Sequence, residues 1–323
     1  NLSYGGMYFD RYNQNADGSL NLNYRGRKTN TFLTYSAGYD DMNANLLSES
    51  LYGSNYEMAM SNTSNMLMRN FNQMFRAGND WYISDKDVLG VIVNGTFRNG
   101  STDTYGDNFT EHTLNGSPVA RLLSDIDNND RFDGVSANLN YTRTFDQSKM
   151  QELTLNADYS WYDISNRSRQ EDIPDPDFTP LMILDSTIFR QNAAQNLQIW
   201  SAKADYQQLF WQTGLLEAGL KWSRTITDNN SVREDFFHNT WNYNDSLSNL
   251  FLYDEQIAAA YISAAKSFGQ KWSVKIGLRG EYTYARGDWR SAEKTSVKSY
   301  FNLFPTAFVS YMPTQKWRLP APY

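Results

Sequence analysis

The chain has 323 residues, no cysteine and a formal net charge of −7, and it is polar on average although 15% of its residues are aromatic. The lack of cysteine excludes disulfides and thiolate chemistry, and the acidic balance, without a cluster of Lys and Arg between aromatic residues, excludes a nucleic-acid surface as the expected role. No run of about 18 apolar residues is present, so we expect no transmembrane helix.

Strict alternation of apolar and polar residues predicts β-strands along most of the chain. The pattern occurs in residues 19–26, 135–145, 153–162, 215–224 and 272–285. In 153–162, LTLNADYSWY, apolar side chains fall on one face and polar side chains on the other. In 272–285, WSVKIGLRGEYTYA, charged residues recur on the second face. Helical spacing fits none of these windows, and we therefore predict an all-β, antiparallel fold.

The connections between the predicted strands alternate between short and long. The short, polar ones are residues 27–30, 84–87, 146–151, 208–213, 269–271 and 312–315, and the long ones are residues 48–60, 101–117, 165–192 and 227–248. This spacing predicts roughly 12 strands, with a thirteenth beginning at Trp317. Short turns at one end of a sheet and long loops at the other are typical of transmembrane β-barrels. A soluble β-sandwich, with the aromatic residues filling its core, is the alternative.

The aromatic residues also fit the thickness of a membrane. Trp272 and Tyr282 are ten residues apart, which at about 3.3 Å per residue and a tilt near 40° spans roughly 25 Å. Trp211 and Trp222 bracket the strand predicted at 214–226 in the same way. We therefore predict that the strands form a transmembrane β-barrel.

Three motifs in order resemble a known family. Residues 253–283, YDEQIAAAYISAAKSFGQKWSVKIGLRGEYT, followed by 299–313, SYFNLFPTAFVSYMP, resemble the barrel region of TonB-dependent outer-membrane receptors of the Bacteroidetes type. Residues 20–36 and 75–91 are similar to strand-turn-strand units of the same family. The resemblance implies a bacterial outer-membrane barrel of 22 strands, filled by a plug and energised through TonB, that imports a nutrient ligand such as a chelated metal, a glycan or a peptide. A surface lipoprotein is a further candidate partner.

The chain also departs from that family. It contains neither a recognisable plug nor a TonB-contacting segment near its start, and it stops at RLPAPY just as a strand begins. We therefore expect residues 1–323 to form a single, partial barrel domain of about 12 or 13 strands.

No enzyme site is predicted. His112 and His238 lie far apart in expected loops, and no nucleophile with a matching base can be named. We therefore expect neither enzymatic activity nor a cofactor.

One acidic segment suggests a calcium-binding site. In residues 124–134, SDIDNNDRFDG, the residues Asp125, Asp127 and Asn129 hold the first, third and fifth positions of a calcium loop. Asp130 takes the place of the required glycine, so the EF-hand pattern fails. A looser calcium site is one alternative, and a solvated turn is the favoured one.

Binding residues are predicted in two places. The first is the polar face of the strands, which would face the lumen; the alternative is that its charged residues are salt-bridged wall residues that touch no ligand. The second is the loop at 235–246, whose aromatic residues Phe236, Trp241 and Tyr243 would bind a ligand; the alternative is a simple hairpin extension. The lumen-facing candidates are Asp158, Glu217, Lys221, Lys275, Arg279 and Glu281.

The sequence is compatible with two functions. The chain belongs either to a plug-gated importer or to a structural or adhesive barrel whose loops bind a partner protein without transport. Pro305, within 299–313, is predicted to interrupt its strand because proline lacks the donor for a ladder hydrogen bond.

Overall fold

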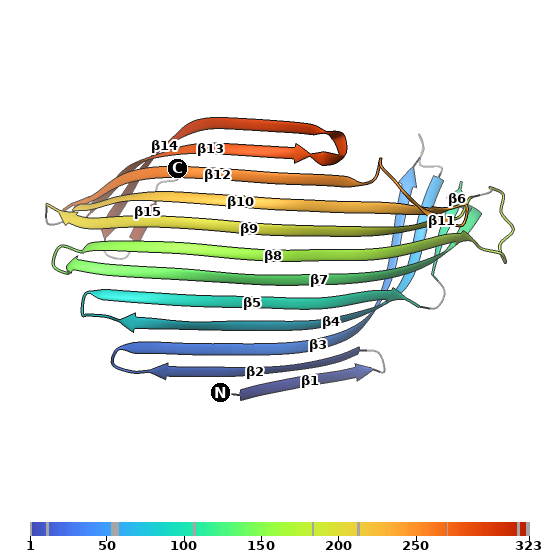
Figure 1. Ribbon diagram of the computed structural model, residues 1–323, viewed down its shortest axis with the longest axis horizontal. Coiled ribbons are helices and arrows are strands. Elements are labelled where there is room, and N and C mark those ends of the chain that lie inside the picture. Colours follow the sequence, from blue (N-terminus) through green and yellow to red (C-terminus); the bar gives the residue numbers. More distant parts are fainter. Residues whose placement is uncertain are drawn as a thin grey trace.

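A computed structural model of the chain describes residues 2–10, 13–52, 58–105, 108–182, 184–211, 214–269, 271–314 and 317–320. These residues form one antiparallel sheet of fifteen strands, with a single short 3-10 turn (Figure 1). The strands are β1 (Leu2–Asp10), β2 (Asn13–Arg25), β3 (Thr29–Tyr52), β4 (Met58–Tyr82), β5 (Asp87–Thr104), β6 (Phe109–Leu114), β7 (Ser117–Asp146), β8 (Gln151–Pro174), β9 (Thr187–Phe210), β10 (Gly214–Phe237), β11 (Thr240–Tyr243), β12 (Asn249–Phe268), β13 (Trp272–Trp289), β14 (Lys294–Thr314) and β15 (Trp317–Pro320), and the turn is η1 (Arg290–Ala292). No helix in this described part is long and apolar enough to cross a membrane.

Thirteen of the strands follow one another across the sheet in chain order. The two others are short additions at one end: β6 pairs with β4 and β7, and β11 folds back on β10. This arrangement confirms the predicted antiparallel, all-β fold and the thirteenth strand that begins at Trp317. The short turns lie together at the left in Figure 1, as predicted.

The predicted long loops are shorter than expected, because the strands continue into them. β3 and β4 stay paired up to Tyr52 and Met58, inside the loop predicted at 48–60. β8 runs to Pro174 and β9 starts at Thr187, so most of the loop predicted at 165–192 is paired strand. Polar residues carry the same backbone donors and acceptors as apolar ones, and two strands that both continue keep satisfying each other's groups. Hydrophilic composition alone was therefore a poor marker of a loop.

The register gives the sheet two distinct faces, since directly paired residues lie on the same face. One row across β8, β9, β10, β12, β13 and β14 is apolar and consists of Leu155, Ala204, Leu220, Ala260, Gly280 and Leu303. The adjacent row on the opposite face is largely polar and consists of Asn156, Lys203, Lys221, Ala259, Glu281 and Asn302. We call these the apolar face and the polar face.

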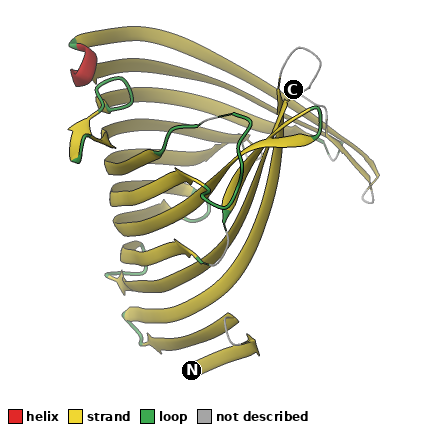
Figure 2. Cartoon of the chain, turned by 90° about the vertical axis from the view of Figure 1, so that its right-hand side faces the viewer, coloured by secondary structure: helices red, strands yellow, loops and turns green. Residues whose placement is uncertain are grey.

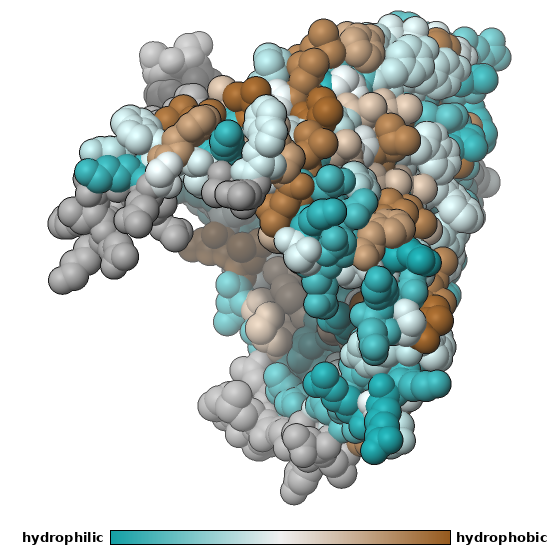
Figure 3. All heavy atoms as spheres, turned by 90° about the vertical axis from the view of Figure 1, so that its left-hand side faces the viewer, coloured by the Kyte–Doolittle hydropathy of each residue, from teal (hydrophilic) through white to brown (hydrophobic). Residues whose placement is uncertain are grey.

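The sheet is a single curved layer without a conventional core, as Figure 2 shows. Its accessible surface is 21442 Å², whereas a compact monomer of 37.3 kDa would expose about 13,700 Å². Among the described residues, no large side chain is fully buried. The soluble sandwich would bury its apolar faces against each other, so these findings exclude it. Figure 3, seen from the end with the short turns, shows the hollow beside the curved wall.

Aromatic residues border the apolar face at two levels. Trp272 contacts Tyr311 at 4.4 Å between ring centroids near the short turns. Tyr159 contacts Trp200 at 4.1 Å near the other border. An ion pair between Arg224 and Asp254, 2.7 Å long, follows on the same face immediately beyond Trp222. The apolar band thus ends where charged side chains begin.

The predicted interruption at Pro305 is wrong. β13 and β14 pair without a register shift from Trp272 and Tyr311 to Trp289 and Lys294, with Pro305 directly opposite Leu278. In an antiparallel ladder every second residue directs its N–H away from a given neighbour. The unbroken register indicates that Pro305 holds such a position, where its missing donor costs the ladder with β13 nothing. β15, the strand on the other side, pairs only with residues 310–314 among those described.

Candidate functional site

The polar face of β8–β14 holds all six of the predicted lumen-facing residues. Lys221 and Glu281 lie in the polar row described above. Glu217, Lys275 and Arg279 lie in neighbouring rows of the same face, and Asp158 lies further along β8, paired with Ser201. The register of the paired strands thus keeps the alternating polar residues of neighbouring strands on one face.

Most of the charges on this face are paired. Lys275 bonds to Glu217, and Arg279 bonds to Glu281 on its own strand. A third pair, Lys203 with Asp205 at 2.6 Å, was not predicted, although alternation in residues 201–206, SAKADY, could have indicated it.

Two predicted residues of this face lie outside these ion pairs. Asp158 accepts a hydrogen bond of 2.6 Å from the Asn138 amide. No ion pair joins Lys221 to a carboxylate within the described ranges. The charges of the six predicted residues and of Lys203 and Asp205 therefore sum to zero, with Lys221 and Asp158 outside the ion pairs.

Side chains on the polar face bridge across whole strands. Lys275 on β13 reaches Glu217 on β10 over β12, and Ser263 on β12 donates to the same carboxylate at 2.8 Å. Tyr261 on β12 likewise donates its hydroxyl to Asp205 on β9, across β10. Such convergence is expected on the concave side of a curved sheet, where side chains approach one another.

A groove of about 330 Å³ lies beside these contacts, between β12, β13 and β14. Gly277 forms part of its floor: a Cβ added there would lie 2.8 Å from the Thr306 hydroxyl and 3.1 Å from Ser263. Phe304, 44% exposed, presents an unburied ring on this largely polar face. Aromatic surface next to hydrogen-bonding groups suits the binding of a polar ligand or peptide. The groove is lined by Lys203, Tyr261, Ile262, Ser263, Gly277, Leu278, Arg279, Phe304 and Thr306.

The predicted ligand-binding aromatics form a cluster on the β10–β11 hairpin. Phe236 pairs with Trp241, with their rings 5.1 Å apart, and Glu234 pairs with Tyr243. The Arg190 guanidinium lies 4.5 Å from the Trp241 ring and bonds to Glu234 at 2.6 Å. These side chains follow the even positions of β10, which also carry Leu220 and Trp222. The cluster therefore faces the same side as the apolar band, away from the polar groove.

Asp235 stabilises this hairpin from the polar face. It accepts hydrogen bonds from the Asn244 amide and from Arg233 Nε, the latter at 2.8 Å. The Asn244 bond, aided by Arg233, holds the pKa of Asp235 below its usual value. The hairpin is thus a paired extension of the sheet, and ligand binding by its aromatic residues stays a prediction.

The acidic run at 124–134 is strand and not the turn that was favoured. Asp125, Asp127 and Asn129 occupy alternate positions of β7, so about 13 Å separates the first from the last. Asn129 donates to Asp127 at 2.8 Å, and Asp125 accepts from Thr104 at 2.7 Å. An extended strand cannot wrap its oxygens around one ion. Over the described ranges no three His, Asp or Glu side chains gather into a metal site.

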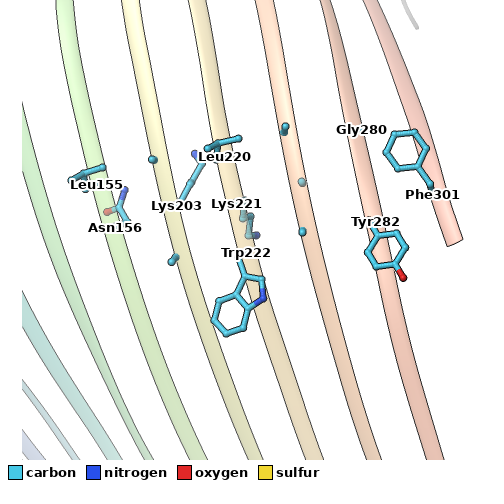
Figure 4. A pocket seen from close by; sticks show the side chains of 14 residues that line it. Leu155, Asn156, Lys203, Leu220, Lys221, Trp222, Gly280, Tyr282 and Phe301 are labelled. Atoms are coloured by element: carbon cyan, nitrogen blue, oxygen red, sulfur yellow. The ribbon is translucent and has the colours of Figure 1, made fainter. Parts of the chain in front are cut away.

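The apolar face carries a hollow of its own. Small residues such as Ala204, Ala260 and Gly280 form its floor, and Leu220, Trp222 and Phe301 rise beside them (Figure 4). Lys203 and Lys221 come from the same strands, but by register their side chains belong to the opposite face. Nothing in this hollow offers a charged or catalytic group, so its lining matches that of the surrounding apolar band.

Comparison with known proteins gives one family. The sequence model of the outer membrane protein beta-barrel family matches residues 143–321, which is more than half of the chain. No curated protein matches.

Two solved structures are similar at 11% identity. The outer membrane protease OmpT from Escherichia coli covers 88% of this chain and 96% of its own, with a TM-score of 0.28. For the toluene transporter TbuX from Ralstonia pickettii, the similarity covers 92% of this chain and 80% of the transporter chain, with a TM-score of 0.27. Likenesses this weak support no argument about function.

Proposed function

The chain belongs to the outer membrane protein beta-barrel family and resides in the bacterial outer membrane, in contact with its lipid, and on that premise we propose that it forms part of the wall of a TonB-dependent importer. The cargo is a nutrient ligand, namely a chelated metal, a glycan or a peptide. The wall completes a barrel of 22 strands around a plug. It has no enzymatic activity and needs no cofactor.

The observation that carries this proposal is the contrast between the two faces of one layer. The apolar row from Leu155 to Leu303 matches lipid, and the polar row beside it matches water. The polar face further holds converging ion pairs and a groove beside Phe304. Any outer-membrane barrel has an apolar outer and a polar inner face, so the groove and the side chains that bridge across strands are what favour an importer over a barrel that only anchors loops.

Specific motifs support the TonB-dependent type. Residues 253–283 and 299–313, which resemble that family, form β12, β13 and β14. These three strands also line the groove. TonB and a plug, and a surface lipoprotein as a further partner, belong to this proposal.

Substitutions at two adjacent positions of β14 test it. Thr306 lines the groove, and Ala307 lies on the opposite face, opposite Ile276. In the full-length protein, Thr306→Trp is expected to reduce uptake of the cargo at least tenfold, whereas Ala307→Trp leaves it unchanged. Uptake of a radiolabelled ferric chelate, an oligosaccharide and an oligopeptide would be measured in cells with and without TonB. Uptake that does not depend on TonB, or equal effects of the two variants, would reject an energised importer.

A second candidate is an adhesive barrel that binds a partner protein. The observation in its favour is the hairpin cluster, because Trp241 and Tyr243 face outward from the wall and Tyr243 is 52% exposed. For this function, Tyr243→Ala would abolish binding of cells to the partner and leave every uptake assay unchanged. Thr306→Trp would then have no effect on either.

A further inference from the structure

A row of hydrogen-bond donors crosses four strands on the outward side of the wall. Ser101, Asn129, Arg167 and Asn192 are consecutive register partners on β5, β7, β8 and β9. We call this row the donor belt. It continues the apolar face beyond its aromatic border, because Arg167 and Trp161 share a face of β8 at a spacing of six residues.

Among the described residues, Arg167 has no ion-pair partner, whereas the arginines in the adjacent rows do. In the next row outward, Arg169 bonds to Glu171 and Arg190 bonds to Glu234. In the row toward the apolar band, Arg131 bonds to Asp133. Arg167 is exposed, and over the described ranges no carboxylate lies within ion-pair distance of it. A guanidinium between two amides is a ready partner for phosphate, which accepts several N–H donors at once.

The surface around Arg167 is hollowed. Two depressions of about 360 and 430 Å³ share Asn129, Arg167 and Asn192 in their linings; Asp127 and Glu234 also line the first, and Asp130 and Asp163 the second. Ala194, one row closer to the apolar band, leaves open space next to Arg167. The donors therefore line a concave surface that can receive a group of several atoms.

The height of the donor belt restricts the ligand. Six residues of a tilted strand separate Arg167 from Trp161, which places Arg167 about 15 Å beyond the aromatic border. The headgroup region of an ordinary phospholipid adds only about 5–8 Å to the hydrocarbon core. A membrane lipid that reaches Arg167 needs a larger headgroup, such as one built from several sugars.

We propose that the donor belt binds the phosphorylated saccharide headgroup of a glycolipid in the outer leaflet. Phosphate sits on Arg167, and the amides of Asn129 and Asn192 bond to neighbouring phosphate or sugar oxygens. The acyl chains lie on the apolar face below, which already contacts lipid. The inference depends on the membrane location and not on the transport proposed above.

Two arginines on opposite faces allow a matched test. Arg98 on β5 is also exposed, but it pairs with Phe132 and belongs to the polar face. Full-length protein, Arg167→Gln and Arg98→Gln would each be placed in nanodiscs of phospholipid with added lipopolysaccharide. Bound glycolipid would be counted by native mass spectrometry. The expected result is at least a tenfold weaker association for Arg167→Gln and no change for Arg98→Gln.

Three further arms separate the sources of the ligand. Dephosphorylated glycolipid should bind to wild type and to Arg167→Gln equally weakly, and phospholipid alone should leave the site empty. Deacylated, phosphorylated saccharide in solution should bind more weakly than the intact glycolipid, because the membrane anchor raises its local concentration.

The proposal fails under any of three results: Arg167→Gln retains wild-type affinity, phospholipid competes equally, or free saccharide binds as tightly as glycolipid. Asn192→Ala, expected to weaken binding severalfold, replaces Arg167→Gln if the latter does not fold.

Discussion

Tyr261 on β12 donates a hydrogen bond to Asp205 on β9, and it does so directly over Gly219 on the intervening strand β10. Gly219 is the register partner of both residues. A Cβ at this glycine would lie 2.4 Å from the tyrosine ring and 2.7 Å from the Asp205 carboxylate. The absence of a side chain at one position therefore permits a contact that spans two strand spacings, about 9.5 Å.

Adding a methyl group at this glycine should separate the two residues. We expect Gly219→Ala to lower the free energy of unfolding by about 1–3 kcal/mol, the usual cost of overpacking. Equilibrium unfolding in lipid vesicles would measure it. Gly38→Ala on the polar face of β3 is the control, because a Cβ there would only meet Asp17 and Ala16 at 3.7 and 3.8 Å. Equal costs at Gly219 and Gly38 would mean that Tyr261 does not cross over β10 as described.

Reversing the charges of Lys275 and Glu217 tests the other bridge across a strand. Lys275→Glu should destabilise the sheet because it places two carboxylates together, next to Asp205. Glu217→Lys should also destabilise it, and the double variant should recover part of the loss. Since the two side chains are 48% and 28% exposed, we expect a coupling of about 0.5–1 kcal/mol. A double-mutant cycle in vesicles would measure it, and additive effects would show that the pair contributes nothing.

The sequence predicted the two faces well because the period of a strand is fixed at two residues. Once 272–285 is known to be a strand, Leu278 and Arg279 must lie on opposite faces. The contact between Tyr261 and Asp205 could not be predicted, since it depends on the register of three strands and on Gly219. The path of β14 through Pro305 depends on which pairs are hydrogen-bonded, and alternation carries no information about that. The hairpin cluster was predicted as aromatic, but its outward orientation follows from the continuation of β10 to Phe237.

Replacing a leucine of the apolar face with a charged residue should lower the free energy of unfolding, even though the leucine is exposed. Leu220 is 63% exposed in the sheet itself. In a membrane its exposed surface contacts lipid, and we expect Leu220→Arg to cost about 2–4 kcal/mol. Ser223→Arg on the polar face is the control and should cost about 0.5 kcal/mol or less. Unfolding in vesicles distinguishes them, and a neutral Leu220→Arg would contradict the assignment of this face to lipid.

Acid should loosen the β10–β11 hairpin. Hydrogen bonds from Asn244 and Arg233 lower the pKa of Asp235 in the folded state. The stabilisation they provide is therefore complete above the ordinary aspartate pKa, about 3.9, and is lost as the pH falls through the lower folded value. The hairpin should stay fastened from pH 7 to about pH 4 and open below it.

A spin label can report this opening, because the chain has no cysteine and Ser246→Cys adds one at an exposed turn. Label mobility should rise only below about pH 4. In Asp235→Asn, mobility should already be raised at pH 7. A change that remains below pH 4 in this variant would include the contribution of Glu234, whose pKa is also lowered by its bond from Arg190. Mobility that stays constant down to pH 2 in the otherwise unaltered chain would show that Asp235 does not hold the hairpin closed.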